Sequence, residues 1–188
     1  MDPQDLKAAP RALDTPRLRL ECPCEAHAAA FVDSLLRSMP ALRFVGWGLV
    51  ERDLAWALDF CRRDGALVAS GGGLIFMAFE RDSGRYVGRI DLHTFDFEAP
   101  RCEIGYVGDE ATAGQGLMRE AVLAVMAMGF RIGLARIHAI SDARNARALV
   151  FAERLGMQRE GLLRAYERDP QGQLCDMVMF AALSPQPS

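Results

Sequence analysis

The spacing of apolar residues predicts strands and helices in alternation. Polar and apolar residues alternate over residues 15–21, which is typical of a half-buried strand. Apolar residues then recur at every third or fourth position over 25–39 and over 51–63, which indicates two amphipathic helices. Pro40 ends the first of them, because proline lacks the N–H that a helix interior requires.

The second half of the chain predicts a mixed sheet. Glycines at 71–73 form a turn, and the nearly unbroken apolar pattern of 117–130 is typical of a helix buried on most sides. Together the patterns favour one domain that mixes strands and helices. The further predicted elements are strands at 74–80, 86–95 and 102–107, a helix at 117–130, a strand at 135–141, a helix at 146–155, and strands at 162–168 and 174–181.

Composition supports a single globular domain with short ends. The chain has 188 residues, of which 51% are hydrophobic and 25% charged, and this balance excludes a mainly disordered protein. Residues 1–14 lack periodicity and predict a flexible N-terminal arm, residues 15–183 the domain, and 184–188 a tail. The longest apolar run, 121–130, is shorter than the roughly 20 residues of a membrane helix, so we expect no membrane association.

Charge and cysteine content narrow the possible partners, metal sites and location of the protein. The formal net charge is −3, which argues against a nucleic-acid partner that needs a broad basic surface. Lys7 is the one lysine beside 21 arginines, so catalysis by lysine is almost excluded. The five cysteines are irregularly spaced, and no second ligand pair accompanies Cys22 and Cys24. We therefore expect no metal, reduced thiols and a cytoplasmic location, because the start of the chain also lacks a secretory signal.

A glycine pair marks the start of the long apolar helix. Gly114 and Gly116 flank Gln115 directly before residue 117. Glycine lets the backbone turn sharply and approach a ligand closely, and the first N–H groups of a helix have no partner within it. Phosphate binds naturally at such a terminus. The pair alone is consistent either with a phosphate site or with a simple tight turn.

Five motifs in order carry a resemblance to a known family. They are EIGY at 103–106, GQGLMREA at 114–121, DARN at 142–145, LGM at 155–157 and EGLLR at 160–164. This arrangement resembles the GNAT superfamily of acyl-CoA-dependent N-acetyltransferases, and most of all its branch that acetylates N-termini of ribosomal proteins. The resemblance implies a mixed, mostly antiparallel sheet of six to seven strands, with helices on both faces and a central splayed pair of parallel strands. The alternative of a nucleotide-binding Rossmann protein fails because Arg119 stands where its last glycine belongs.

The resemblance implies acetyl-CoA as cosubstrate and assigns residues to it. The backbone at Tyr106 and Val107 would pair with the pantetheine arm and polarise the thioester carbonyl. Asn145 would hydrogen-bond the same arm, although an ordinary helix N-cap is an equally simple role for it. The loop that would hold the pyrophosphate consists of Ala113, Gly114, Gln115, Gly116, Leu117 and Met118. The family usually has Gln or Arg at the position of Ala113.

The catalytic residues are less clear. By resemblance Glu167 is the candidate general base, with a solvated acid at a strand end as the plain alternative, and Glu103 beside the cofactor is the second candidate. Ala148 and Ala152 stand where relatives carry a Ser or Tyr that protonates the leaving thiolate. For His93, a packed or surface imidazole is the alternative to a place in the acceptor cleft.

We therefore expect direct transfer of acetyl from acetyl-CoA to a protein or peptide N-terminal α-amine in a ternary complex. Trp47, in a loop, and His93, on a central strand, are the candidates to line the acceptor cleft. A small-molecule amine such as a polyamine, amino acid or antibiotic is the alternative acceptor. Because of the two alanines, an acyl-CoA-binding regulatory module without catalysis also remains open. A homodimer is common in the branch, and the sequence leaves it open.

Overall fold

An open sheet of eight strands forms the centre of the computed structural model, which describes residues 1–45 and 50–185. Its strand order is β1-β2-β3-β4-β5-β6-β8-β7, and every neighbouring pair is antiparallel except β5 and β6. The strands are β1 (Ala12–Asp14), β2 (Leu18–Glu21), β3 (Leu74–Glu80), β4 (Tyr86–Asp96), β5 (Arg101–Gly108), β6 (Arg136–Asp142), β7 (Gln158–Arg168) and β8 (Leu174–Leu183). The mixed, mostly antiparallel sheet expected from the sequence is confirmed, with one strand more than expected.

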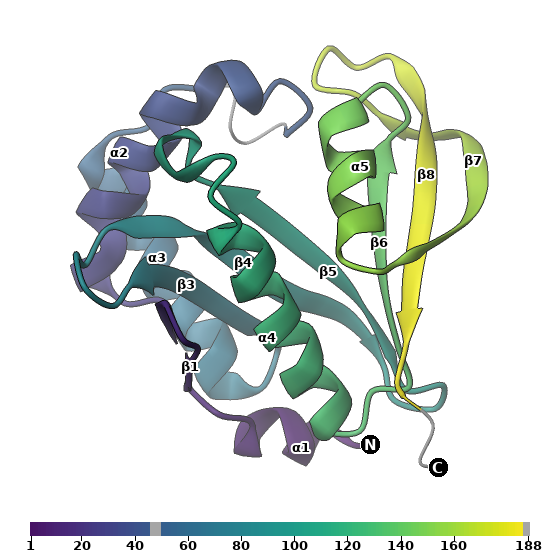
Figure 1. Cartoon of the computed structure of the whole chain (residues 1–188), viewed down its shortest axis with the longest axis horizontal. Helices are drawn as coiled ribbons and strands as arrows, with labels where there is room; N and C mark the ends of the chain where they lie inside the picture. The colour runs from purple at the N-terminus through teal and green to yellow at the C-terminus, as the bar shows by residue number, and fades with distance from the viewer. Residues whose placement is uncertain (46–49, 186–188) are drawn as a thin grey trace.

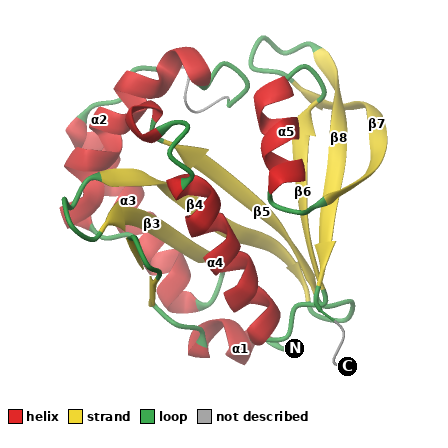
Figure 2. Cartoon of the chain, in the orientation of Figure 1, coloured by secondary structure: helices red, strands yellow, loops and turns green. Residues whose placement is uncertain are grey.

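Helices cover both faces of this sheet (Figures 1 and 2). Helices α4 (Leu117–Arg131) and α5 (Ala146–Arg154) lie on one face, and α2 (Ala28–Ser38) and α3 (Leu54–Ser70) lie on the other. Two apolar cores result. The larger lies under α4 and contains Val122 and Val125, and the smaller joins α2 and α3 around Phe31.

Local capping sets the ends of the helices. Helix α3 begins at Leu54, three residues later than the apolar spacing predicts, because the Asp53 side chain accepts a hydrogen bond from Trp56 N at 2.8 Å. It then continues to Ser70, where Gly71 takes the left-handed conformation with φ +79°. The amphipathic spacing ends earlier than the helix, since its last turns are largely exposed.

The first 14 residues are structured, which corrects the expectation of a loose arm. Helix α1 (Pro3–Ala8) is closed by a capping box between Asp2 and Asp5, and its Leu6 is only 1% exposed. Strand β1 pairs with β2 and accounts for the additional strand of the sheet. Six helical residues with one buried apolar side chain are too few to produce a recognisable period, so the sequence pattern missed them.

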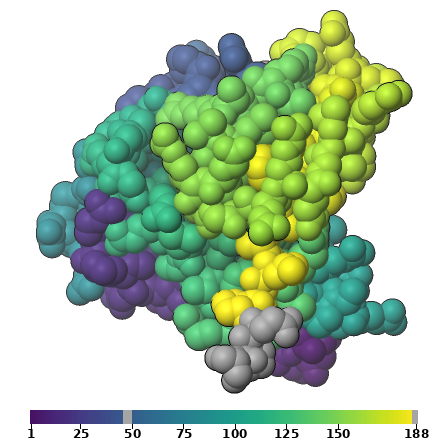
Figure 3. Space-filling model, turned by 45° about the vertical axis from the view of Figure 1, so that its right-hand side comes forward, coloured from purple at the N-terminus to yellow at the C-terminus, as the bar shows by residue number. Residues whose placement is uncertain are grey.

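The C-terminal part of the chain forms one side of the molecule. Strand β7 forms one edge of the sheet, and most of its residues are exposed. In Figure 3 the C-terminal segments, coloured light green to yellow, lie together on that side. Within the described residues, no helix combines the length and the apolar character that crossing a bilayer requires.

Candidate active site

The two parallel strands separate after three residue pairs. β5 and β6 pair at Arg101–Arg136, Cys102–Ile137 and Glu103–His138. Beyond Glu103, β5 continues to pair with β4, and β6 pairs with β8, so the facing edges of β5 and β6 diverge (Figure 1). The expected splay is therefore present. Backbone groups on the open edge of β5 can pair with an extended ligand, as an added strand would.

Tyr106 and Val107 lie on β5 beyond this point and point to opposite faces. The Tyr106 ring contacts the Phe151 ring of α5, with centroids 5.1 Å apart. Val107 packs against the core formed by α2 and α3. Burial raises the pKa of Tyr106 to about 12, so its phenol stays protonated at neutral pH. The role expected of Tyr106 and Val107 uses their backbone groups to pair with the pantetheine arm. Both residues lie on the part of β5 whose edge is open, as this role requires.

The glycine loop leads into an open helix terminus. Gly114 and Gly116 have φ of +77° and +74°, a region that side chains rarely allow. Gly116 is the N-cap of α4 and supplies no side-chain hydrogen bond, whereas α3 and α5 are capped by Asp53 and Asn145. Within the part of the chain that the structure describes, the first N–H groups of α4 therefore have no side-chain acceptor, which leaves them available to an anion.

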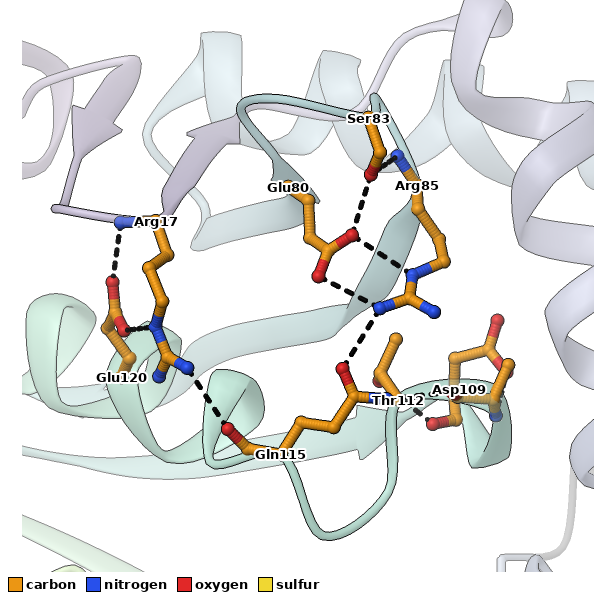
Figure 4. A network of polar contacts seen from close by, with 9 residues as sticks. Arg17, Glu80, Ser83, Arg85, Asp109, Thr112, Gln115 and Glu120 are labelled. Carbon is orange, nitrogen blue, oxygen red and sulfur yellow. Dashed lines mark hydrogen bonds and ion pairs between the residues drawn. The ribbon is translucent and has the colours of Figure 1, made fainter.

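Gln115 points away from this terminus and is held by two arginines (Figure 4). Its carbonyl accepts a hydrogen bond from Arg17 Nη1 at 3.1 Å, and its Oε1 accepts one from Arg85 Nη2 at 3.0 Å. Its Nε2 donates to the carbonyl of Ala111 at 3.2 Å. Arg85 is itself paired with Glu80. The Gln115 side chain is thus engaged within the protein, and the loop offers mainly backbone donors.

Asn145 stands between the end of β6 and the start of α5. Its Oδ1 accepts a hydrogen bond from Ala148 N at 3.3 Å, so the simple N-cap role is present. This contact uses only the carbonyl half of the amide. Ala148 and Ala152 lie on the same helix, and Ala152 is buried, so neither position offers a proton donor.

A half-buried carboxylate marks the point where β5 and β6 part. Glu103 Oε2 lies 3.8 Å from His138 Nε2 on β6. Burial raises the pKa of Glu103, His93 lowers it in part, and the like charges of Glu167 and Asp91 raise it further. Burial, together with Arg136, lowers the pKa of His138, so its imidazole is neutral at pH 7.

Glu167 lies on β7 and is exposed to solvent. The strand is bulged between Leu163 and Glu167, and Ala165 within the bulge has φ +49°, an unusual value for alanine. Asp176 holds this bulge by accepting the Ala165 N–H at 2.8 Å. The structure thus brings the charge of Glu167 within electrostatic range of Glu103, although the two are 64 residues apart in sequence.

His93 lies on the same strand face as Asp91, and its Nε2 is 3.4 Å from Asp91 Oδ2. It is half-exposed and also contacts Thr94, so it borders the Glu103 region without being enclosed. Trp47, the other residue expected in the acceptor cleft, lies outside the described residues.

Three contributors escaped the sequence analysis. Arg17 and Arg85 reach Gln115 across 98 and 30 residues, and Asp91 adds its charge to the Glu103 cluster from the neighbouring strand. No short motif encodes such contacts. The alternation of β4 would have placed Asp91 and His93 on one face, once the strand pairing was known.

Comparisons with known proteins agree with this geometry. Residues 17–158 match the acetyltransferase (GNAT) domain family. The uncharacterized N-acetyltransferase p20 of Bacillus licheniformis is 31% identical over 132 residues, which are 70% of this chain and 74% of that protein.

Solved structures share the fold at low identity. The microcin C7 self-immunity acetyltransferase MccE, in complex with acetyl-CoA and AMP, superposes with a TM-score of 0.82 at 15% identity, covering 90% of this chain and 93% of that one. An acetyltransferase from Salmonella typhimurium that modifies the N-terminal serine of ribosomal protein L7/L12 gives 0.80 at 20% identity, with 90% and 96% covered. On the family match and the identity to p20, the chain belongs to the GNAT acetyltransferase family and is an acyl-CoA-dependent acetyltransferase.

Proposed function

We propose that this enzyme transfers the acetyl group of acetyl-CoA to a protein or peptide N-terminal α-amine, by direct transfer in a ternary complex. One observation carries the proposal: β5 and β6 part beyond a half-buried carboxylate, Glu103, and the far end of β5 leads through the glycine loop to the open N-terminus of α4. A thioester laid along the open edge of β5 would bring its carbonyl close to that carboxylate.

The donor site uses backbone groups. The N–H groups of Gly116, Leu117 and Met118 would bind the pyrophosphate at the positive end of the α4 dipole. The open edge of β5 at Tyr106 and Val107 would bind the pantetheine arm, and an N–H there would polarise the thioester carbonyl.

Catalysis requires a neutral amine. We assign Glu103 as the general base, because burial raises its pKa and it lies at the splay. It takes the ammonium proton, and the amine nitrogen attacks the carbonyl carbon. The carbon–sulfur bond then breaks to release the CoA thiolate, and the second nitrogen proton passes through water to that thiolate, which leaves a neutral amide. Glu167 contributes negative charge that draws the cationic acceptor in. Water can protonate the thiolate, since Ala148 and Ala152 supply no donor.

The proposed acceptor class follows from the pKa values of the two kinds of amine and from the enzymes of similar fold. An α-amine has a pKa near 8 and is roughly 10% neutral at pH 7, whereas a lysine amine near 10.4 is below about 0.1% neutral. A site whose general base is a carboxylate therefore favours α-amines. Similar folds occur in enzymes described as acting on ribosomal-protein N-termini.

A small-molecule amine is the second candidate. It is favoured by the equally close fold of the microcin C7 self-immunity enzyme, which is not described as acting on a protein N-terminus. A screen that measures free thiol release from acetyl-CoA separates the two. We expect kcat/KM to be highest for peptides with free N-termini. Highest turnover with polyamines or amino acids would assign the small-molecule role, and absence of turnover with any amine would leave an acyl-CoA-binding module. In the cell we expect a cytoplasmic enzyme that acts as a monomer or homodimer.

A further inference from the structure

Arg17 contacts the glycine loop from outside the helix that the loop begins. It lies in the turn between β1 and β2 and donates from Nη1 to the carbonyl of Gln115 at 3.1 Å. Its Nε donates to Glu120 Oε2 at 2.7 Å, and its backbone N–H donates to Glu120 Oε1 at 3.0 Å. One side chain therefore joins the loop and the first turn of α4 (Figure 4).

The contact with the carbonyl fixes the orientation of a peptide group. In a trans peptide the C=O and the following N–H point in opposite directions. Because the Gln115 carbonyl points to Arg17, the Gly116 N–H points away from it. Among the described residues, that N–H has no hydrogen-bond acceptor. Arg17 thus directs a free donor toward the side on which an anion could reach the start of α4.

Arg17 also neutralises a charge that would oppose an anion. Glu120 lies in the first turn of α4, where its carboxylate suits the helix dipole but repels a phosphate. Burial raises the pKa of Glu120, but hydrogen bonds from Thr15 and Arg17 outweigh this and lower the pKa, so the carboxylate is ionised at neutral pH. Without Arg17 this charge would face the phosphate uncompensated.

We infer that Arg17 is a positioning residue for the acyl-CoA pyrophosphate. It holds the Gln115–Gly116 peptide in the orientation that binds phosphate before the ligand arrives, and it offsets the charge of Glu120. This inference rests on the proposed phosphate loop. Preorganisation of this kind raises affinity because the ordering cost is met during folding and not during binding.

The test compares two acyl donors with and without the pyrophosphate. Acetyl-CoA contains it, whereas S-acetylpantetheine has the same thioester and arm without it. In Arg17→Met, kcat/KM for acetyl-CoA should fall about tenfold, as expected for the loss of a hydrogen bond to a charged group. The value for S-acetylpantetheine should change by less than about twofold, since its binding does not use the loop.

A neighbouring arginine provides the matched control. Arg81 donates to the Thr15 carbonyl at 3.3 Å and makes no contact with the loop within the described residues, so Arg81→Met removes the same charge nearby and should leave both donors unaffected. Arg17→Lys keeps the charge with a single point of donation and should recover part of the loss. An equal loss with both donors in Arg17→Met, or no loss with either, would overturn the inference.

The same assay separates this inference from the loop assignment. Gly116→Ala alters the loop itself and should also discriminate against acetyl-CoA. If Gly116→Ala shifts the ratio between donors and Arg17→Met does not, Arg17 has no positioning role and the loop assignment survives. If neither variant shifts the ratio, the pyrophosphate binds elsewhere and the loop assignment fails together with the inference.

Discussion

Replacing Gly116 with alanine tests the phosphate loop through backbone conformation. A Cβ at this position would have only Arg17 Nη2 within 4 Å, at 3.7 Å, so steric overlap does not decide the outcome. The φ of +74° decides it, because a left-handed residue with a side chain costs about 1–2 kcal/mol. The loop can relieve that strain by turning its N–H groups out of place.

Gly172 provides a matched control. It lies in the turn between β7 and β8, has φ +81°, and a Cβ there would meet nothing within 4 Å. Alanine at either position should lower the melting temperature by roughly 2–8 °C, since each kcal/mol corresponds to about 2–4 °C in a chain of this size. Only Gly116→Ala should weaken acetyl-CoA binding, by about tenfold or roughly 1.4 kcal/mol.

Differential scanning fluorimetry gives the melting temperatures, and isothermal titration calorimetry gives the acetyl-CoA affinities. The contrary result is that both variants lose similar stability while Gly116→Ala keeps the wild-type affinity. In that case the glycine serves the turn alone, and the open helix terminus is not the anion site.

Two further predictions concern the base and the N-terminal segment. The wild-type kcat/KM should fall as pH drops through the raised pKa of Glu103, because a protonated base cannot accept the amine proton. Glu103→Gln should lose this fall at acidic pH, and its kcat should be lower by about 10²–10⁴-fold. If Glu167→Gln loses the acidic fall instead, Glu167 is the base. Leu6→Ala should lower the free energy of unfolding, measured in urea, by about 2–5 kcal/mol. The control Leu36→Ala, at a 44% exposed position, should change it little. Small effects of equal size in both variants would mean that α1 is not part of the core.

Where a structural signal is local, the sequence predicted the fold well. The amphipathic period of 25–39 predicted α2, and the strand predicted at 74–80 matches the bounds of β3. The glycine pair correctly marked the start of α4. The N-terminal segment was missed because its order comes from burial of Leu6 against distant parts of the chain, which no local pattern records.

Some residues of the candidate site were likewise predictable from local motifs, and others were not. Gly114, Gly116 and Asn145 were recognisable because each sits in a short motif at the end of a helix. The support from Arg17 depends on how β2 lies beside α4. The electrostatic coupling of Glu103 and Glu167 depends on a bulged edge strand. Both features depend on tertiary structure, so the sequence could identify these residues but not which of them lie near each other.

Locating the acetyl group on a peptide product shows directly whether the enzyme acetylates N-terminal α-amines. The enzyme and acetyl-CoA are incubated with lysine-free peptides that begin with Ala, Ser or Thr, with an N-blocked peptide that contains one internal lysine, and with a polyamine. The products are analysed by tandem mass spectrometry, with Glu103→Gln as the control for uncatalysed transfer. We expect acetyl on the α-amine of the free peptides, and none above that control on the internal lysine. Efficient labelling of the lysine, or of the polyamine alone, would contradict it.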